Sequence, residues 1–142
     1  LWRVPTSRFG NATPLIIGER LVFVVEPYTV VCLDKMTGKV LWISAGSEPA
    51  AYATLFAVDA NAEPWSRRAL KYGQHGGHSY ASPVTDGKRI WFKGRGAARC
   101  LDLSDGKELW ATELHLAVGD HPHCVPSPLL VGNVLACQGG AS

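Results

Sequence analysis

Two eleven-residue stretches decide the fold: CLDKMTGKVLW at positions 32–42 and CLDLSDGKELW at positions 100–110. They align without gaps, and seven of the eleven positions are identical, namely Cys, Leu, Asp, Gly, Lys, Leu and Trp. Internal self-similarity of this kind is the signature of architectures in which one supersecondary unit recurs along the chain. The sequence therefore predicts a repeat protein.

The residues upstream of this motif repeat as well. The stretches TPLIIG (13–18), SPVTDG (82–87) and SPLLVG (127–132) correspond, and each precedes a short hydrophobic run. Leu1-Trp2 resembles the Leu-Trp pair that closes both motifs. We therefore expect about three copies of one unit, the third of which stops before its own motif begins.

Each unit is expected to contain four short strands joined by tight turns. In the second copy the predicted strands cover 83–85, 89–93, 97–103 and 108–112. Asp-Gly pairs stand at two of the turns, where Gly tolerates positive φ and the Asp side chain bonds its own backbone.

One four-stranded sheet cannot bury both of its faces, whereas sheets arranged radially as blades cover one another. The predicted fold class is all-β, a β-propeller fragment of about three four-stranded blades. Trp42 and Trp110 are then expected to wedge against the neighbouring sheet. A plain antiparallel sandwich is the alternative, but it does not explain a motif that recurs in register.

The composition is that of an ordinary globular domain, with 142 residues, 46% hydrophobic and 18% charged residues, and a net charge of +2. No run of five like charges occurs, so the sequence indicates no nucleic-acid partner. No apolar run is long enough for a transmembrane helix. The first residues resemble neither a signal peptide nor a natural start, and both ends suggest a piece of a longer protein.

The motif resembles the tryptophan-docking motif of propellers named for pyrroloquinoline quinone (PQQ), Ala-x-Asp-x-x-Thr-Gly-x-x-x-Trp. Cys replaces the Ala in both copies, and Asp105 replaces the Thr in the second. The resemblance implies a partial PQQ-like propeller over 1–142, with an insert at about 45–74. The structural motif positions it implies are Asp34, Gly38, Trp42, Asp102, Gly106 and Trp110.

Within these propellers the chain looks most like the relatives of the outer-membrane assembly lipoprotein, which typically carry seven or eight blades and no bound quinone. This implies a non-catalytic scaffold that binds a protein or carbohydrate partner in a periplasmic or secreted location. Three blades would leave open sheet edges and exposed apolar faces, so we expect the remaining blades, or other copies of the chain, to cover them.

A fragment of a PQQ-dependent dehydrogenase is the alternative function, with PQQ and calcium as its cofactors. Enzymes of that kind carry an adjacent Cys-Cys pair, an Asp base and a calcium site, and no such set can be placed here. No catalytic triad is indicated either. The sequence therefore leans away from an enzyme, and we expect no catalytic residues, cofactor or metal.

Four histidines are candidates for a ligand site at the mouth of the central channel. His78 and His123 each stand five residues before the proline of their repeat, and His75 and His121 lie just upstream. Imidazoles are common ligands, and equivalent positions in neighbouring blades bring them to one end. The competing interpretation is that they are loop residues bonded to backbone carbonyls.

The insert supplies a second candidate surface. Trp65, Arg67 and Arg68 lie in a stretch, 63–70, that is compatible with a short helix. Long insertions between blades commonly carry function, so these side chains are candidates for contacting a partner. A loop packed over the neighbouring blade is the alternative.

The four cysteines are not expected to form disulfides. Cys32 and Cys100 occupy equivalent strands of neighbouring sheets, which pack about 10 Å apart, beyond the reach of a disulfide. A turn at 132–133 would place Cys137 opposite Pro128 rather than opposite Cys124. We expect Cys32 and Cys100 to act as small buried hydrophobic residues.

Overall fold

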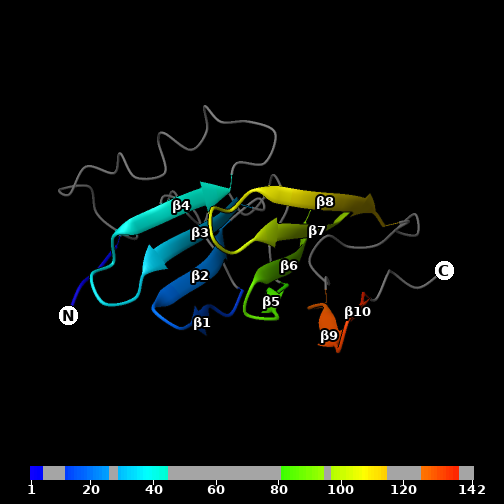
Figure 1. Ribbon diagram of the computed structural model, residues 1–142, viewed down its shortest axis with the longest axis horizontal. Coiled ribbons are helices and arrows are strands. Elements are labelled where there is room, and N and C mark those ends of the chain that lie inside the picture. Colours follow the sequence, from blue (N-terminus) through cyan, green and yellow to red (C-terminus); the bar gives the residue numbers. More distant parts are fainter. Residues whose placement is uncertain (5–11, 26–28, 45–80, 95–96, 115–125, 138–142) are drawn as a thin grey trace, which may run out of the picture.

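The computed structural model of the protein describes residues 1–4, 12–25, 29–44, 81–94, 97–114 and 126–137. In these ranges the chain forms ten β-strands, arranged in three antiparallel sheets. Figure 1 shows two four-stranded sheets next to each other and a small third sheet beyond the second.

The strands of each sheet follow one another in sequence order. The first sheet contains β1 (Leu15–Ile17), β2 (Arg20–Val25), β3 (Thr29–Asp34) and β4 (Val40–Ser44). The second contains β5 (Val84–Thr85), β6 (Arg89–Gly94), β7 (Ala97–Asp102) and β8 (Glu108–Glu113). The third contains β9 (Leu129–Val131) and β10 (Val134–Ala136).

The four strands predicted for the second unit are confirmed, with bounds that differ by a residue or so. The third strand ends at Asp102 instead of Leu103, because Leu103 already belongs to the following turn and its N–H bonds the Lys88 carbonyl at 2.9 Å. The glycines at the first turn of each unit adopt positive φ, as at Gly18 (57°) and Gly87 (88°).

The two four-stranded sheets repeat even in their irregularities. In the first sheet the register between β3 and β4 shifts between Cys32 and Leu33. In the second sheet the register between β7 and β8 shifts at the corresponding place, between Cys100 and Leu101. A bulge increases the local twist of a strand. The repeated motif therefore specifies a particular backbone distortion as well as a turn.

The main core lies between the first and second sheets. It combines side chains from one face of the first sheet with side chains from the facing side of the second. Its buried members are Ala12, Val22, Val24, Val30, Cys32, Ile90, Phe92, Leu101 and Leu103. Because residues alternate between the faces of a strand, Val22 and Val24 face the second sheet, whereas Leu21 and Phe23 point the other way.

The opposite face of the first sheet carries a second core. Val25, Val31 and Leu33 are buried there, and Trp2 and Val4 pack against them. The segment that begins at Leu1 thus covers the first sheet on the side away from the second. The described sheets are stacked face to face, with an apolar layer between the first two.

Candidate functional site

The turn between the last two strands of the first sheet is built around Asp34. One carboxylate oxygen of Asp34 accepts hydrogen bonds from the backbone N–H of Met36 (3.0 Å) and of Thr37 (2.7 Å), and from the Thr37 hydroxyl (2.8 Å). The Asp34 carbonyl accepts the N–H of Gly38, which has a φ of 73°. Glycine adopts this backbone conformation without the strain that a Cβ would cause.

The second sheet repeats this turn with different side chains. The Asp102 carboxylate accepts from the backbone N–H of Ser104 (2.7 Å) and from its hydroxyl (2.6 Å), and Gly106 has a φ of 74°. We call residues 34–38 and 102–106 the docking turns.

Hydrogen bonds lower the pKa of both turn carboxyls. The Thr37 hydroxyl, followed by its backbone N–H, holds the pKa of Asp34 below its usual value. The Ser104 hydroxyl and N–H do the same for the pKa of Asp102, and the positive charge of Arg20 adds to the effect. Both shifts have the same cause, because a carboxylate that accepts hydrogen bonds is stabilised in its charged form.

Each docking turn receives a tryptophan from the chain segment before it. The Trp2 indole Nε1 donates to the Lys35 carbonyl at 3.0 Å, and the Trp42 indole Nε1 donates to the Leu103 carbonyl at the same distance. The indole rings cover the buried glycines of the turns. A Cβ built on Gly38 would lie 2.6 Å from the Trp2 ring, and one on Gly106 would lie 2.4 Å from the Trp42 ring. Glycine is therefore required there by contact as well as by φ.

Arg20 is a second donor to the docking turn of the next sheet. Its guanidinium Nη1 donates to the Leu103 carbonyl and, at 3.1 Å, to the Ser104 carbonyl. The Leu103 carbonyl therefore accepts from both Arg20 and Trp42. Sequence reasoning missed this residue, although a signal existed: Arg20 and Arg89 stand at the same place in their units, opposite Asp34 and Asp102.

The Thr-Pro and Ser-Pro dipeptides, which stand just before the first strand of each sheet, link successive sheets. The backbone N–H of Thr13 donates to the Ser82 hydroxyl at 2.8 Å, and the N–H of Ser82 donates to the Ser127 hydroxyl at 2.8 Å. The same bond therefore runs from each described unit to the next. The sequence showed that these dipeptides recur, but it did not reveal that the hydroxyl before the proline accepts a hydrogen bond from the preceding unit.

The comparisons with known proteins agree with this repeated geometry. The sequence profile of the family described as "Outer membrane protein assembly factor BamB" matches residues 1–93, about two thirds of the chain. The chain belongs to this family.

Solved structures place the BamB-family chain within a propeller. BamB from Moraxella catarrhalis matches with a TM-score of 0.59 and 17% identity, over 94% of this chain and 32% of that one. The quinohemoprotein alcohol dehydrogenase from Comamonas testosteroni matches with a TM-score of 0.56 and 14% identity, over 92% of this chain and 17% of that one. The chain thus spans about a third of the length of the BamB structure. No curated protein sequence matches it.

The predicted ligand and partner residues of this BamB-family chain lie outside the described residues. This applies to all four channel histidines and to the three residues of the insert. They are His75, His78, His121, His123, Trp65, Arg67 and Arg68. They remain predictions. Within the described ranges, no three His, Cys, Asp or Glu side chains gather in a way that could hold a metal ion.

The described turns form an open groove of about 680 Å³ at one end of the first two sheets. It is lined by residues 17–20, 87–88 and 102–104. Its charged side chains have both signs, and several already make contacts: Arg20 bonds the docking turn, and Glu19 pairs with Lys35 at 3.2 Å. Arg20 thus bonds the first sheet to the second, whereas the pair of Glu19 and Lys35 joins two turns of the first sheet.

The thiols agree with the sequence interpretation. Cys32 and Cys100 are free and fully buried, and burial raises the pKa of both. Each of these cysteines is paired across the sheet with a tryptophan of the docking motif on the last strand. Cys32, for example, lies opposite Val22 on β2 and opposite Trp42 on β4. A small side chain at this place leaves room for the indole. No helix in the described part of the chain is long and apolar enough to cross a bilayer.

Proposed function

We propose that the chain is part of a propeller scaffold that binds a protein partner in the assembly of outer-membrane proteins. The observation that carries this proposal is that the polar side chains around the docking turns form hydrogen bonds within the protein. Asp34 and Asp102 hold the turns, and Arg20 bonds the neighbouring sheet. The aspartates fix the turns of their own sheets and Arg20 connects two sheets, so these polar groups serve the structure, as expected of a scaffold. The family to which the chain belongs supplies the biological process.

The location follows from the same proposal. A scaffold for outer-membrane protein assembly acts in the periplasm or at the cell surface. The exposed face of β8 and the segments outside the described residues provide its contact surfaces. Among these, the insert with Trp65, Arg67 and Arg68 would contact the protein partner.

The channel histidines add a ligand site to the proposal. His78 and His123 would lie at one end of the channel, within reach of one bridging group. If so, His78→Ala weakens binding of an anion such as phosphate at pH 5.5, where imidazole is protonated, and leaves the unfolding midpoint unchanged. Equal phosphate affinity of the wild type and the variant would remove this part of the proposal.

Complementation tests the proposed process. In a bacterium deleted for its own BamB-family protein, the full-length protein that contains this chain should restore the amount of folded outer-membrane β-barrels. Folding is measured by the heat-dependent mobility of a porin on gels. The matched control is the same protein with Trp42→Ala, which disturbs the scaffold and should restore less. No recovery with a stably produced wild-type protein would contradict the proposal.

A dehydrogenase is the second candidate, because the chain also matches the fold of a quinohemoprotein alcohol dehydrogenase. Under this alternative, the full-length protein reduces an electron-accepting dye when it is given PQQ, calcium and a primary alcohol. We expect no dye reduction above the rate without protein. Saturable dye reduction that depends on PQQ would favour the enzyme over the scaffold.

A further inference from the structure

The layer between the second and third sheets differs in its chemistry from the layer between the first two. In the first layer, Val24 on β2 and Phe92 on β6 are buried in one hydrophobic core. Counted from the turn glycine of each unit, Lys93 stands at the place of Val24 in the second unit, and Cys137 stands at the place of Phe92 in the third. The repeat therefore places an amine and a thiol where the first layer has two core hydrophobic side chains.

Lys93 and Cys137 also act on each other electrostatically. Lys93 is 4% exposed, and Cys137 is partly buried. Burial lowers the pKa of the Lys93 amine, and Cys137 opposes this change. Burial likewise raises the pKa of the Cys137 thiol, and Lys93 opposes that change. Because burial disfavours the charged form of each group, both shifts favour an uncharged amine, with its lone pair free, beside an uncharged thiol.

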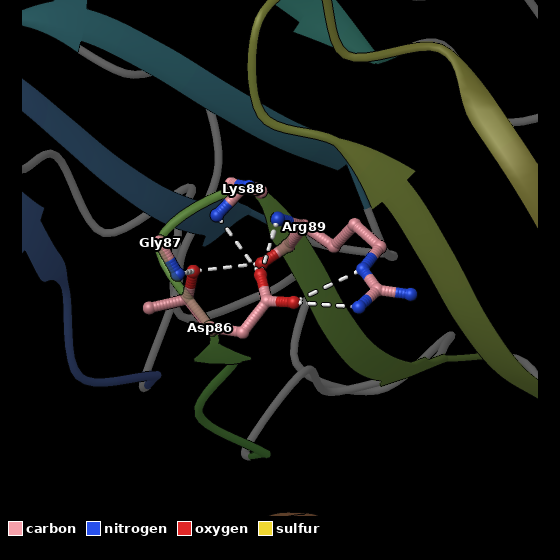
Figure 2. Close-up of polar contacts among 5 residues, drawn as sticks. Asp86, Gly87, Lys88 and Arg89 are labelled. Atoms are coloured by element: carbon pink, nitrogen blue, oxygen red, sulfur yellow. Dashed lines mark hydrogen bonds and ion pairs between the residues drawn. The ribbon is translucent and has the colours of Figure 1, made fainter. Parts of the chain in front are cut away.

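Two other charged side chains on this face of the second sheet bind each other. Arg89 Nε and Nη2 donate to one carboxylate oxygen of Asp86 at 3.0 and 2.8 Å, as Figure 2 shows. The same guanidinium lies 5.1 Å from the centre of the Trp91 ring. Arg89 thus engages Asp86 at the turn end of β6, whereas Lys93 lies near the opposite end of that strand. Among the described residues, Cys137 is the ionisable group that acts on the Lys93 amine.

We propose that Lys93 and Cys137 form an oxidation-sensitive pair, in which hydrogen peroxide links the second sheet to the third through a sulfenamide bond between Lys93 Nζ and Cys137 Sγ. Cys137 is partly exposed, so a small oxidant reaches its sulfur, while the buried Lys93 is held beside it. The first layer has no equivalent pair, because its counterparts are Val24 and Phe92. The inference does not depend on which partner the scaffold serves.

The reaction consumes one molecule of peroxide in two steps. In the first step the Lys93 amine accepts the thiol proton, and the Cys137 thiolate attacks peroxide. An S–O bond forms as the O–O bond breaks, and the hydroxide that leaves takes the proton from Lys93 to become water. In the second step the Lys93 lone pair attacks the sulfenic sulfur. An S–N bond forms as the S–O bond breaks, and the leaving hydroxide takes a proton from the nitrogen as a second water. The sulfur is oxidised by two electrons, and the chain loses two hydrogen atoms.

Mass spectrometry of a single-cysteine chain tests this bond. Cys32→Ala, Cys100→Ala and Cys124→Ala leave only Cys137, so no disulfide can form within the chain. After treatment with hydrogen peroxide, we expect the chain to lose the mass of two hydrogen atoms. Peptide mapping should then find the peptides of Lys93 and Cys137 joined. Dithiothreitol should restore the original mass and a thiol that reacts with maleimide, because a thiol cleaves the S–N bond.

Lysine variants of the single-cysteine chain identify the nitrogen. Lys93→Met removes the amine and keeps a long side chain in the core, and Lys93→Arg is a second variant that keeps the charge. Each should give at least tenfold less cross-linked chain, and Cys137 should instead gain oxygen as sulfinic and sulfonic acids, which dithiothreitol does not reverse. Lys88→Arg is the matched control, because Lys88 is an exposed lysine of the same hairpin, and it should cross-link normally. Circular dichroism checks that each variant is folded.

Three results would overturn the proposal. The first is a folded single-cysteine chain that keeps its mass, or gains only oxygen, when peroxide is added. The second is an equal loss of two hydrogen atoms in the Lys93 variants, which would place the bond on another nitrogen. The third is a bridge that retains an oxygen atom, which would contradict a direct bond between Lys93 Nζ and Cys137 Sγ.

Discussion

The first and second sheets have the same strand order and the same register shift, but they differ in the side chains on the face that each turns toward the next sheet. In the first sheet this face carries Ile17, Val22 and Val24, which pack in the core between the sheets. At the corresponding positions the second sheet carries Asp86, Trp91 and Lys93. The docking glycine, the turn aspartate and the tryptophan are the same in both. A few shared residues thus fix the turn geometry, while the residues on the facing side determine how apolar each contact between sheets is.

The largest difference between the two sheets should follow removal of the docking tryptophans. Trp42→Ala removes a half-buried ring and its hydrogen bond to Leu103, so we expect a loss of about 3 kcal/mol in the free energy of unfolding. Trp110→Ala changes an exposed ring and should cost less than about 1 kcal/mol. Urea unfolding of both variants measures the contrast. Equal losses would mean that the contact of Trp42 with the docking turn adds nothing to stability beyond the packing of a tryptophan within its own sheet.

The turn glycines should show the next largest contrast. Gly106→Ala places a methyl group against the Trp42 ring at a positive φ, and a loss of about 2 to 3 kcal/mol is expected. Gly87→Ala is the matched control, since Gly87 also has a positive φ but no atom within 4 Å of the added Cβ. It should cost only about 1 to 2 kcal/mol. Thermal unfolding distinguishes the two, and an equal loss would show that φ alone explains the glycine.

Lys93 should add to the second sheet a pH-dependent contribution to stability that Val24, at the equivalent position, does not make in the first. It is 4% exposed at the place of Val24, and burial lowers its pKa, with Cys137 acting weakly in the opposite direction. The folded chain thus releases this proton at a lower pH than the unfolded chain, so stability rises with pH between the folded pKa and the ordinary value of 10.5.

The variant Lys93→Val copies the first sheet and tests this pH dependence. The raised pKa values of the cysteine thiols act in the opposite direction over the same pH range, so the variant is compared with the wild type at each pH. The gain in unfolding midpoint given by Lys93→Val should shrink between pH 7 and pH 10. A gain that stays constant over this interval would show that Lys93 does not contribute to the pH dependence.

The smallest effect is expected at the Thr-Pro and Ser-Pro dipeptides before the first strand of each sheet. Ser82→Ala removes the acceptor of the Thr13 N–H and should cost about 1 kcal/mol. Ser82→Thr keeps a hydroxyl, as Thr13 does in the first unit, and should retain most of the stability. Hydrogen exchange of the Thr13 amide measures the bond directly. Unchanged exchange in Ser82→Ala would mean that this hydroxyl does not link the sheets.

Much of the fold could be predicted from the sequence, because the motif combines local and long-range requirements. Asp-Gly turns and alternating strands specify each hairpin, and the recurring Trp42 and Trp110 indicate stacked sheets. The structure adds the reciprocal half of that contact, the buried Gly106 that the ring covers. A glycine required by a distant indole looks in the sequence like any other turn glycine.

The polar contacts between sheets could not be predicted in the same way. Arg20 and Arg89 occupy the same place, yet one bonds the next sheet and the other its own hairpin. The partner of each arginine follows from its surroundings. Arg20 faces the Leu103 and Ser104 carbonyls of the next sheet, whereas Arg89 has Asp86 beside it in its own hairpin. The predicted histidine site lies in segments outside the described residues, so it remains a prediction.

The central claim is that the ring of one sheet and the glycine of the next hold neighbouring sheets together as a unit. A double-mutant cycle between Trp42 and Gly106 tests it most directly, by urea unfolding of the wild type, Trp42→Ala, Gly106→Ala and the double variant. We predict strong non-additivity: in the Trp42→Ala background, Gly106→Ala should cost no more than Gly87→Ala does in the wild type. Additive losses within about 0.5 kcal/mol would contradict the claim, because they would show that the two residues stabilise the chain independently.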